Sequence, residues 1–208
     1  GRFAQLRRAR HKELVLMDDQ QLTGALYHIG TAYGSSAFRN PVVTNEVKIT
    51  ASSPVSRFTD PRRLASRTFS PVSYASPHLH ESGAISTYWQ VDLGEQRRLF
   101  CNYYTMRQDA SEEYPRDWML QGSQDGERWV TMHRHEDDCA IVRPGQFHSW
   151  EIDPKAAVIP LRYFMVTLTG PTCARARPVD SAERCGSHKL DRYRLCMSSI
   201  EFYGTLEY

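Results

Sequence analysis

The chain has 208 residues and a formal net charge of +2, since 26 lysines and arginines nearly balance 24 aspartates and glutamates. This balance excludes the basic excess that is typical of nucleic-acid-binding domains. Hydrophobic residues make up 40% of the chain, which excludes a disordered protein, and no apolar run approaches the roughly 20 residues that span a bilayer. We therefore expect one large globular domain that binds neither nucleic acid nor a membrane.

The start of the chain carries a basic run, made up of Arg7, Arg8, Arg10, His11 and Lys12. This pattern is typical of either a short amphipathic helix or an extended lead-in, and we expect its charges to be solvated. We assign residues 1–20 to a basic lead-in or linker and residues 21–208 to one folded domain. Because the first residue is a glycine and no signal-peptide pattern follows, we also expect a piece of a longer chain.

Residues 53–87 predict a long irregular stretch after a first strand in "NEVKITASS". The stretch is rich in serine and contains the prolines Pro54, Pro61, Pro71 and Pro77. Loops of this length are uncommon inside compact domains and are usually functional or mobile.

From residue 87 onward, short runs with alternating apolar and polar residues follow one another. They include "TYWQVDLG", "RRLFCNYYTMRQ", "FHSWEID", "LRYFMVTLTG" and "LCMSSIEFYGTL". Alternation with a period of two is the mark of half-buried strands. Eight or more short strands without a convincing internal helix predict an all-β sandwich.

The stretch "RDWMLQGSQDGERW", residues 116–129, predicts a β-hairpin. Two alternating runs flank an Asp-Gly pair, which is the strongest short-range hairpin signal. Trp118 and Leu120 are expected on one face of the first arm, and Met119 and Gln121 on the other.

The order and spacing of these blocks resemble the discoidin-like, factor V/VIII type C domain superfamily. The resemblance is carried by "YWQVDLGEQRRL", "YYTMRQDASEEYPRDWMLQGSQDGERWVTM", "RYFMVTLTG" and "SSIEFYGTL", and it covers about residues 44–206. It implies the galactose-binding-like jelly-roll fold. It also implies that the hairpin lies in a central sheet, and we expect four buried core side chains: Trp89, Trp118, Trp129 and Phe202.

Two departures favour a particular branch of this superfamily. The sequence has no Cys near its start to form the disulfide that closes extracellular relatives, and no loop shows the consecutive apolar residues of membrane-binding versions. The sequence is more similar to intracellular versions attached to BTB, Kelch or HECT regions, and more distantly to the Doc domain of the anaphase-promoting complex. The resemblance therefore implies an intracellular, cytoplasmic or nuclear location and protein recognition, often within ubiquitin-ligase assemblies.

The cysteines are odd in number: Cys101, Cys139, Cys173, Cys185 and Cys196. We expect all five to be reduced, because their spacing shows no pairing and a chain of this length needs no disulfide staples. A zinc site formed by Cys173, Cys185 and His188 is the alternative, but it lacks a fourth ligand and closely spaced pairs. We therefore assign no metal.

No motif of a catalytic site is present. "HRHEDD" places His133 and His135 on one face of a strand, next to carboxylates, as a metal site or a general base would require. We favour a hairpin end that turns through a solvated acidic loop, because no third ligand lies at a useful spacing. We expect a non-catalytic domain without a cofactor.

The candidate binding residues lie where predicted strands begin or end. They are His78, His80, Glu81, Arg107, Gln108, Asp109 and Arg116. Such positions gather at one rim of a sandwich, and the planar guanidinium of Arg suits carboxylates, carbonyls or sugar hydroxyls. For Arg116, the alternative is an ion pair with Asp109 or Glu113 that only pins the loop.

Taken together, these residues predict a recognition module whose ligand is a protein segment. A carbohydrate bound at the same rim is the alternative, with Tyr74, Tyr88 or Tyr114 as the aromatic platform. A structural part of a large assembly is a third interpretation.

Overall fold

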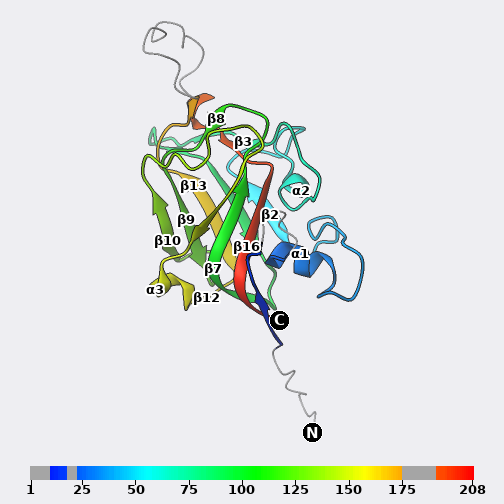
Figure 1. The fold of residues 1–208 in the computed structure, drawn as a ribbon. Coiled ribbons are helices and arrows are strands. Elements are labelled where there is room, and N and C mark those ends of the chain that lie inside the picture. The colour runs from blue at the N-terminus through cyan, green and yellow to red at the C-terminus, as the bar shows by residue number, and fades with distance from the viewer. Residues whose placement is uncertain (1–9, 18–22, 175–190) are drawn as a thin grey trace, which may run out of the picture.

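The protein is a sandwich of two antiparallel sheets, each with five strands (Figure 1). The computed structural model describes residues 10–17, 23–174 and 191–208. The first sheet contains β1 (His11–Leu14), β16 (Ser199–Glu207), β7 (Arg98–Arg107), β11 (Phe147–Glu151) and β12 (Pro160–Leu161). The second sheet has the order β10 (Trp129–His135), β9 (Trp118–Ser123), β13 (Tyr163–Leu168), β6 (Tyr88–Asp92) and β2 (Lys48–Ala51). The predicted all-β sandwich is confirmed.

Short elements complete the described part of the chain. Three two-residue pairs join β3 (Tyr74–Ala75) to β15 (Leu195–Cys196), β4 (His78–Leu79) to β5 (Ile85–Ser86), and β8 (Glu113–Tyr114) to β14 (Cys173–Ala174). The helical turns are α1 (Ala25–Gly30), α2 (Pro61–Leu64), α3 (Pro154–Ala157) and the 3-10 turn Asp191–Tyr193. No helix among the described residues is long and apolar enough to cross a membrane.

The core lies between the two sheets and follows the period of two. On β6, Trp89 and Val91 are buried while Tyr88, Gln90 and Asp92 are half-buried. Phe164 of β13 meets Phe202 of β16 across the sandwich, with ring centroids 4.6 Å apart. These contacts confirm the predicted burial of Trp89 and Phe202, and Trp118 is buried as well.

The prediction for Trp129 is wrong, because this side chain is only half-buried. Trp129 pairs with Ser123, and Ser123 pairs in turn with Tyr163 of the next strand. Trp129 packs edge-on against the half-buried Tyr163, with ring centroids 6.5 Å apart. The hairpin itself is confirmed, although β10 forms an edge of its sheet and a bulge shifts the register between Thr131 and His133.

The described part of the lead-in is extended, so the predicted amphipathic helix is wrong and the predicted extended lead-in is correct. Residues His11–Leu14 are not helical but form β1, which pairs antiparallel with β16 and buries Leu14. Arg10 and Tyr208 extend this pairing through two backbone hydrogen bonds of 2.9 and 3.0 Å. The strand satisfies backbone groups that β16 would otherwise expose at an edge. Residues 1–9 lie outside the described residues.

The side chains of three cysteines, Cys101, Cys139 and Cys196, are described, and all three are free thiols. Burial raises the pKa of the Cys101 thiol to about 12. The proposed zinc ligands Cys185 and His188 lie outside the described residues.

A buried carboxylate joins the closing strand to the start of the domain. Glu201 of β16 is fully buried, and its oxygens accept hydrogen bonds from the amides of Leu26 at 2.7 Å and Tyr27 at 3.0 Å. These amides belong to the first turn of α1, whose N-cap residue Gly24 has no side chain to cap it. A Cβ at Gly24 would lie 2.0 Å from Cγ of Glu201, so only glycine leaves room for this contact.

The same carboxylate faces Arg67, whose Nη2 lies 3.5 Å from Oε2 of Glu201. Burial raises the pKa of Glu201, and the Arg67 charge and the surrounding amides oppose that rise. Glu201 therefore connects β16, α1 and the segment that follows α2.

A second buried polar group lies between the sheets. Nδ1 of His135 lies 2.7 Å from Oδ2 of Asp138, and Nε2 lies 2.6 Å from the hydroxyl of Tyr104. With Nδ1–H donating to the carboxylate, Nε2 accepts the Tyr104 hydroxyl proton. The indole N–H of Trp118 donates to the same hydroxyl at 3.2 Å, and its ring stacks on His135 with centroids 3.9 Å apart.

The acidic loop is solvated at Glu136 and Asp137, as predicted, but the preceding His135 is buried. Burial lowers the pKa of His135 to about 4, assisted by the neighbouring His133 and His148 and opposed by Asp138. Burial also raises the pKa of Tyr104 well above its usual range. A hydroxyl, imidazole and carboxylate in line are typical of nucleophilic catalysis. Here Tyr104 and Trp118 have no exposed surface, so no substrate reaches them.

We predict that Glu201→Ala lowers the free energy of unfolding by about 3 kcal/mol, because it leaves two buried amides of α1 without their acceptor and removes the carboxylate that pairs with Arg67. Urea denaturation measures the loss. Glu207→Ala is the control, since this residue lies on the same strand and pairs with His11 at the surface. It should cost less than about 1 kcal/mol. Equal losses for the two variants would contradict the role of Glu201.

We also predict that acid weakens the fold through His135. The unfolded chain protonates this ring below about pH 6.5, but the folded protein resists protonation until about pH 4. The unfolded state therefore binds more protons in this window, and stability falls as the pH falls. The loss should be about 2 kcal/mol between pH 7.5 and pH 5.

Urea denaturation across this pH range tests the prediction with His135→Asn, which should show a shallower pH dependence. His78→Asn, at an exposed site on β4, serves as the control and should keep the wild-type slope. A wild-type slope in His135→Asn would show that another group is responsible.

Candidate functional site

The strand directions place four loop regions at one end of the sandwich. At this end β7 finishes at Arg107, directly opposite the first residues of β16 and β11, Ser199 and Phe147. We call it the loop end, and it is formed by residues 52–87, 108–117, 136–146 and the described parts of 169–198. In Figure 1 it is the upper end, and Tyr208 lies at the lower one. The sequence predicts the binding rim at this loop end.

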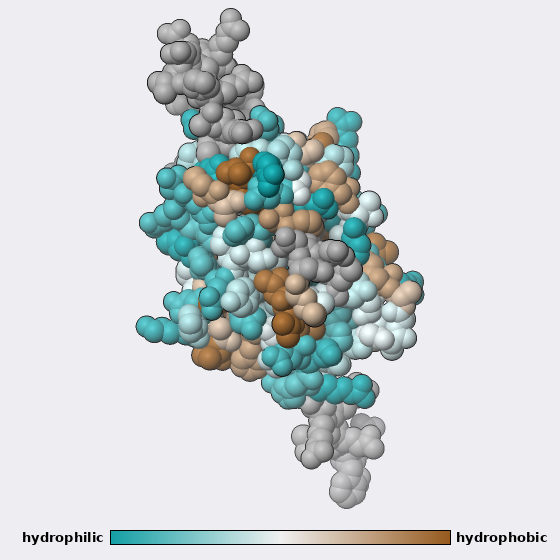
Figure 2. All heavy atoms as spheres, viewed as in Figure 1, coloured by the Kyte–Doolittle hydropathy of each residue, from teal (hydrophilic) through white to brown (hydrophobic). Residues whose placement is uncertain are grey.

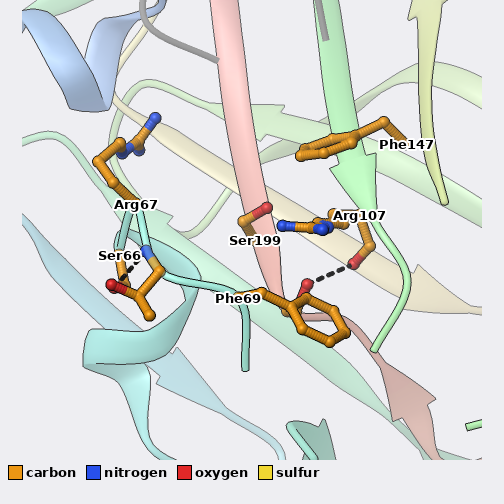
Figure 3. Close-up of a pocket in the computed structure, with 8 residues that line it drawn as sticks. Ser66, Arg67, Phe69, Arg107, Phe147 and Ser199 are labelled. Atoms are coloured by element: carbon orange, nitrogen blue, oxygen red, sulfur yellow. Dashed lines mark hydrogen bonds between the residues drawn. The ribbon is translucent and has the colours of Figure 1, made fainter. Parts of the chain in front are cut away.

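Arg107 is held between two aromatic rings at this end. Its guanidinium carbon lies 4.3 Å from the centroid of Phe69 and 4.5 Å from that of Phe147. Nε donates a hydrogen bond to the carbonyl of Gly145 at 3.0 Å. Figure 3 shows the guanidinium between the two rings, pointing toward Ser199.

Packing between the two rings orients the N–H donors of the Arg107 guanidinium but does not supply acceptors for most of them. Among the described residues, the bond to Gly145 is the one hydrogen bond that the guanidinium makes, so both Nη atoms lack a protein acceptor. Burial lowers the pKa of Arg107, but a guanidinium remains charged at neutral pH. A desolvated cation with oriented donors can bind a carboxylate or another oxygen acceptor strongly.

A small cavity of about 20 Å³ lies beside the guanidinium. It is lined by Ser66, Arg67, Thr68, Phe69, Arg107, Phe147, Ser198 and Ser199. A cavity of this size holds roughly one water-sized group. Three serine hydroxyls and two guanidinium groups make its surroundings polar and positively charged.

Gln108 and Asp109 are buried and hold the surrounding loops. The carboxylate of Asp109 accepts hydrogen bonds from the amides of Ser111 at 2.8 Å and Ser73 at 3.0 Å. The side-chain amide of Gln108 donates to the carbonyl of Glu113 at 3.2 Å. Both side chains therefore position the site and do not face solvent.

Arg116 is also buried, and its Nη1 donates to the carbonyls of Asp138 at 2.7 Å and Ile141 at 3.1 Å. These bonds fasten residues 136–146, the loop that supplies Gly145 to Arg107. Arg116, like Gln108 and Asp109, thus acts on loop geometry.

His78, His80 and Glu81 lie on the short hairpin of β4 and β5 and are exposed. The hairpin makes its own contacts, because Nε2 of His80 lies 2.8 Å from Oγ of Ser86, and the two imidazoles meet at 4.7 Å. The structure therefore brings Arg107, Gln108, Asp109 and Arg116 together around residues 136–146 and places the three hairpin residues apart from that group.

The aromatic partners of Arg107 were not predicted from the sequence. Phe69 comes from the irregular stretch and Phe147 from the start of β11, so neither is near Arg107 along the chain. One signal was available: "SRTFSP" places a Phe two residues after an arginine, inside a loop without periodicity. Among the described residues, no cluster of three or more His, Cys, Asp or Glu side chains could hold a metal ion.

Comparison with known proteins identifies the family. Residues 48–177 match the model of the F5/8 type C domain. A BTB/POZ domain-containing protein of Arabidopsis thaliana is 43% identical over 200 residues, which cover 96% of this chain and 23% of that protein. The E3 ubiquitin-protein ligase hecd-1 of Caenorhabditis elegans is 31% identical over 163 residues, or 76% of this chain and 6% of the ligase. The chain thus spans less than a quarter of either relative.

A solved structure shows the same fold at low sequence identity. CBM32-3 from a family 31 glycoside hydrolase of Clostridium perfringens superposes with a TM-score of 0.51 and 10% identity, covering 77% of this chain and 92% of that one. The jelly-roll fold that the resemblance implied is therefore confirmed. The chain belongs to the F5/8 type C, or discoidin-like, family of jelly-roll binding modules.

Proposed function

We propose that this domain is a non-catalytic recognition module that binds a protein segment at the loop end. The observation that carries the proposal is Arg107, whose donors are oriented by Phe69, Phe147 and Gly145 but have no acceptor among the described residues. Arginine and aromatic side chains dominate the energy of protein interfaces. The rigid ladder of β7 and β16 presents the group at a surface that loops can shape.

The relatives support a place within a larger protein. A BTB/POZ protein and E3 ubiquitin-protein ligases contain a similar stretch as a minor part of their length. We propose that this domain serves likewise as the recognition part of an intracellular multidomain protein, such as a component of a ubiquitin ligase. Neither nucleic acid nor a membrane is a partner in this proposal.

A carbohydrate ligand is the second candidate, and one observation favours it. Phe69 is 38% exposed next to the planar donors of Arg107, and sugars pack on aromatic faces while their hydroxyls bind such donors. Of the three tyrosines expected as platforms, Tyr114 is buried and therefore cannot serve, while Tyr74 and Tyr88 are half-buried.

We predict that Arg107→Met weakens ligand binding about tenfold or more, because it removes the oriented donors. The unbranched Met chain still fills the space between the two rings, so the melting temperature should change little. Arg128→Met is the matched control, since Arg128 is exposed in the turn between β9 and β10, at the other end of the sandwich.

The measurement uses a phage-displayed library of random peptides and a glycan array, each probed with the wild-type domain and both variants. Peptide binding that Arg107→Met abolishes and Arg128→Met preserves supports the proposal. Binding to glycans alone would replace the protein ligand with a carbohydrate. Peptide binding that is insensitive to Arg107→Met would place the site elsewhere.

A further inference from the structure

The segment next to Arg107 is unusually basic. Residues 54–72 contain four arginines, Arg57, Arg62, Arg63 and Arg67, and a single acidic residue. That residue, Asp60, accepts hydrogen bonds from Nε of Arg62 at 2.9 Å and from Nη2 at 2.7 Å, and these bonds lower its pKa. Arg67 is engaged by the buried Glu201. The positive charges that remain for a ligand are those of Arg57, Arg63 and Arg107.

A groove of about 620 Å³ runs along this segment. It is lined by Arg57, Phe58, Arg63, Ser66, Thr68, Phe69, Ser70, Pro71 and Val72. Ser66, Thr68 and Phe69 also line the small cavity beside Arg107, so the groove and the cavity adjoin at these three residues. A ligand in the groove therefore lies next to residues that surround Arg107.

The arginines of the groove are held in place before any ligand arrives. The guanidinium of Arg57 lies 4.4 Å from the ring centroid of Phe58, and Nη1 of Arg63 donates to the carbonyl of Val72. No Asp or Glu is among the described residues that line either the groove or the cavity. Phe69 and Val72 are exposed and give the groove an apolar face. Figure 2 shows that exposed apolar side chains form separate small groups among hydrophilic ones on the face in view.

We propose that the groove and the Arg107 cavity together bind an acidic protein segment, with one carboxylate seated at Arg107 and neighbouring apolar side chains against Phe69 and Val72. This inference rests on the proposed function and specifies its ligand. The opposing charge of the segment complements Arg57, Arg63 and Arg107, none of which has a carboxylate partner among the described residues.

The size of the cavity selects the kind of anion. A space of about 20 Å³ accepts a single small group such as one carboxylate oxygen, which leaves one further oxygen outside, whereas a phosphate group leaves two. The apolar face favours side chains over a sugar-phosphate backbone. The near-balanced charge of the whole chain, +2, also gives little long-range attraction for a nucleic acid or an anionic membrane.

The test uses pools of random peptides in which two adjacent positions are fixed as Glu-Phe, Gln-Phe or phosphoserine-Phe. Fluorescence anisotropy measures their binding to the wild-type domain. The Glu-Phe pool should bind about tenfold more tightly than the Gln-Phe pool, because only the former supplies a carboxylate to Arg107. Raising the salt concentration should weaken the Glu-Phe pool selectively.

Two variants locate the contact. Arg57→Glu reverses one charge of the groove at an exposed position and should weaken the Glu-Phe pool about tenfold. Arg128→Glu makes the same change at the opposite end of the sandwich and should leave binding unchanged. Circular dichroism melting of both variants checks that each is folded.

Each remaining outcome overturns a defined part of the proposal. The Glu-Phe and Gln-Phe pools could bind equally and both lose binding to Arg107→Met. That outcome would refute the acidic ligand and leave the proposed function standing. Failure of every pool would refute both. Tighter binding of the phosphoserine pool, or of a DNA oligonucleotide or phosphatidylserine vesicle used as a competitor, would replace the carboxylate segment with that ligand.

Discussion

The buried carboxylate of Glu201 is the contact on which the candidate site depends. Burying a carboxylate costs several kcal/mol, and only good hydrogen bonds and an opposite charge offset that cost. Glu201 obtains these from the first turn of α1 and from Arg67. Because Arg67 lies two residues before Phe69, the ion pair also restrains the loop whose aromatic ring covers Arg107. The interaction that closes the core therefore also positions one wall of the binding cavity.

The pairing of β7 with β16 separates the site from the chain ends. Arg107 pairs with Ser199 at the loop end, whereas Arg98 pairs with Glu207 at the other end, about 30 Å away by the rise of an extended strand. Arg10 and Tyr208 meet beyond that second end. Arg10 and Tyr208 therefore lie at the end of the sandwich opposite the groove.

Most of the sandwich follows from local pattern, because burial on one face imposes a period of two on β6, β9 and β13. The prediction for Trp129 was wrong because it relied on the size of the side chain, which suggested the core. Its register with Ser123 and Tyr163 places it on the half-buried side of the sheet. Arg107 was found because a guanidinium at a strand end has no packing role there. Phe69 could not be assigned to it, since a loop without periodicity carries no information about its distant contacts. The buried role of Glu201 was also not predicted. A carboxylate among the apolar residues of "SSIEFYG" indicates that a buried partner must satisfy it.

Arg107, the candidate binding group, and His135, a structural group, differ in solvent accessibility, and the size of the pKa shift does not identify which of them is functional. The strongly shifted ring of His135 belongs to a set in which every donor meets an acceptor inside the core, so the shift measures burial and contributes to stability. Arg107 is perturbed less, but packing has oriented donors that the described protein leaves unused at the surface. Aromatic rings that restrain a cation without neutralising it lower the entropy lost on binding an anion. A binding module needs that kind of preorganisation, and in this domain it occurs at the end of β7, next to a groove whose uncompensated charges have the same sign.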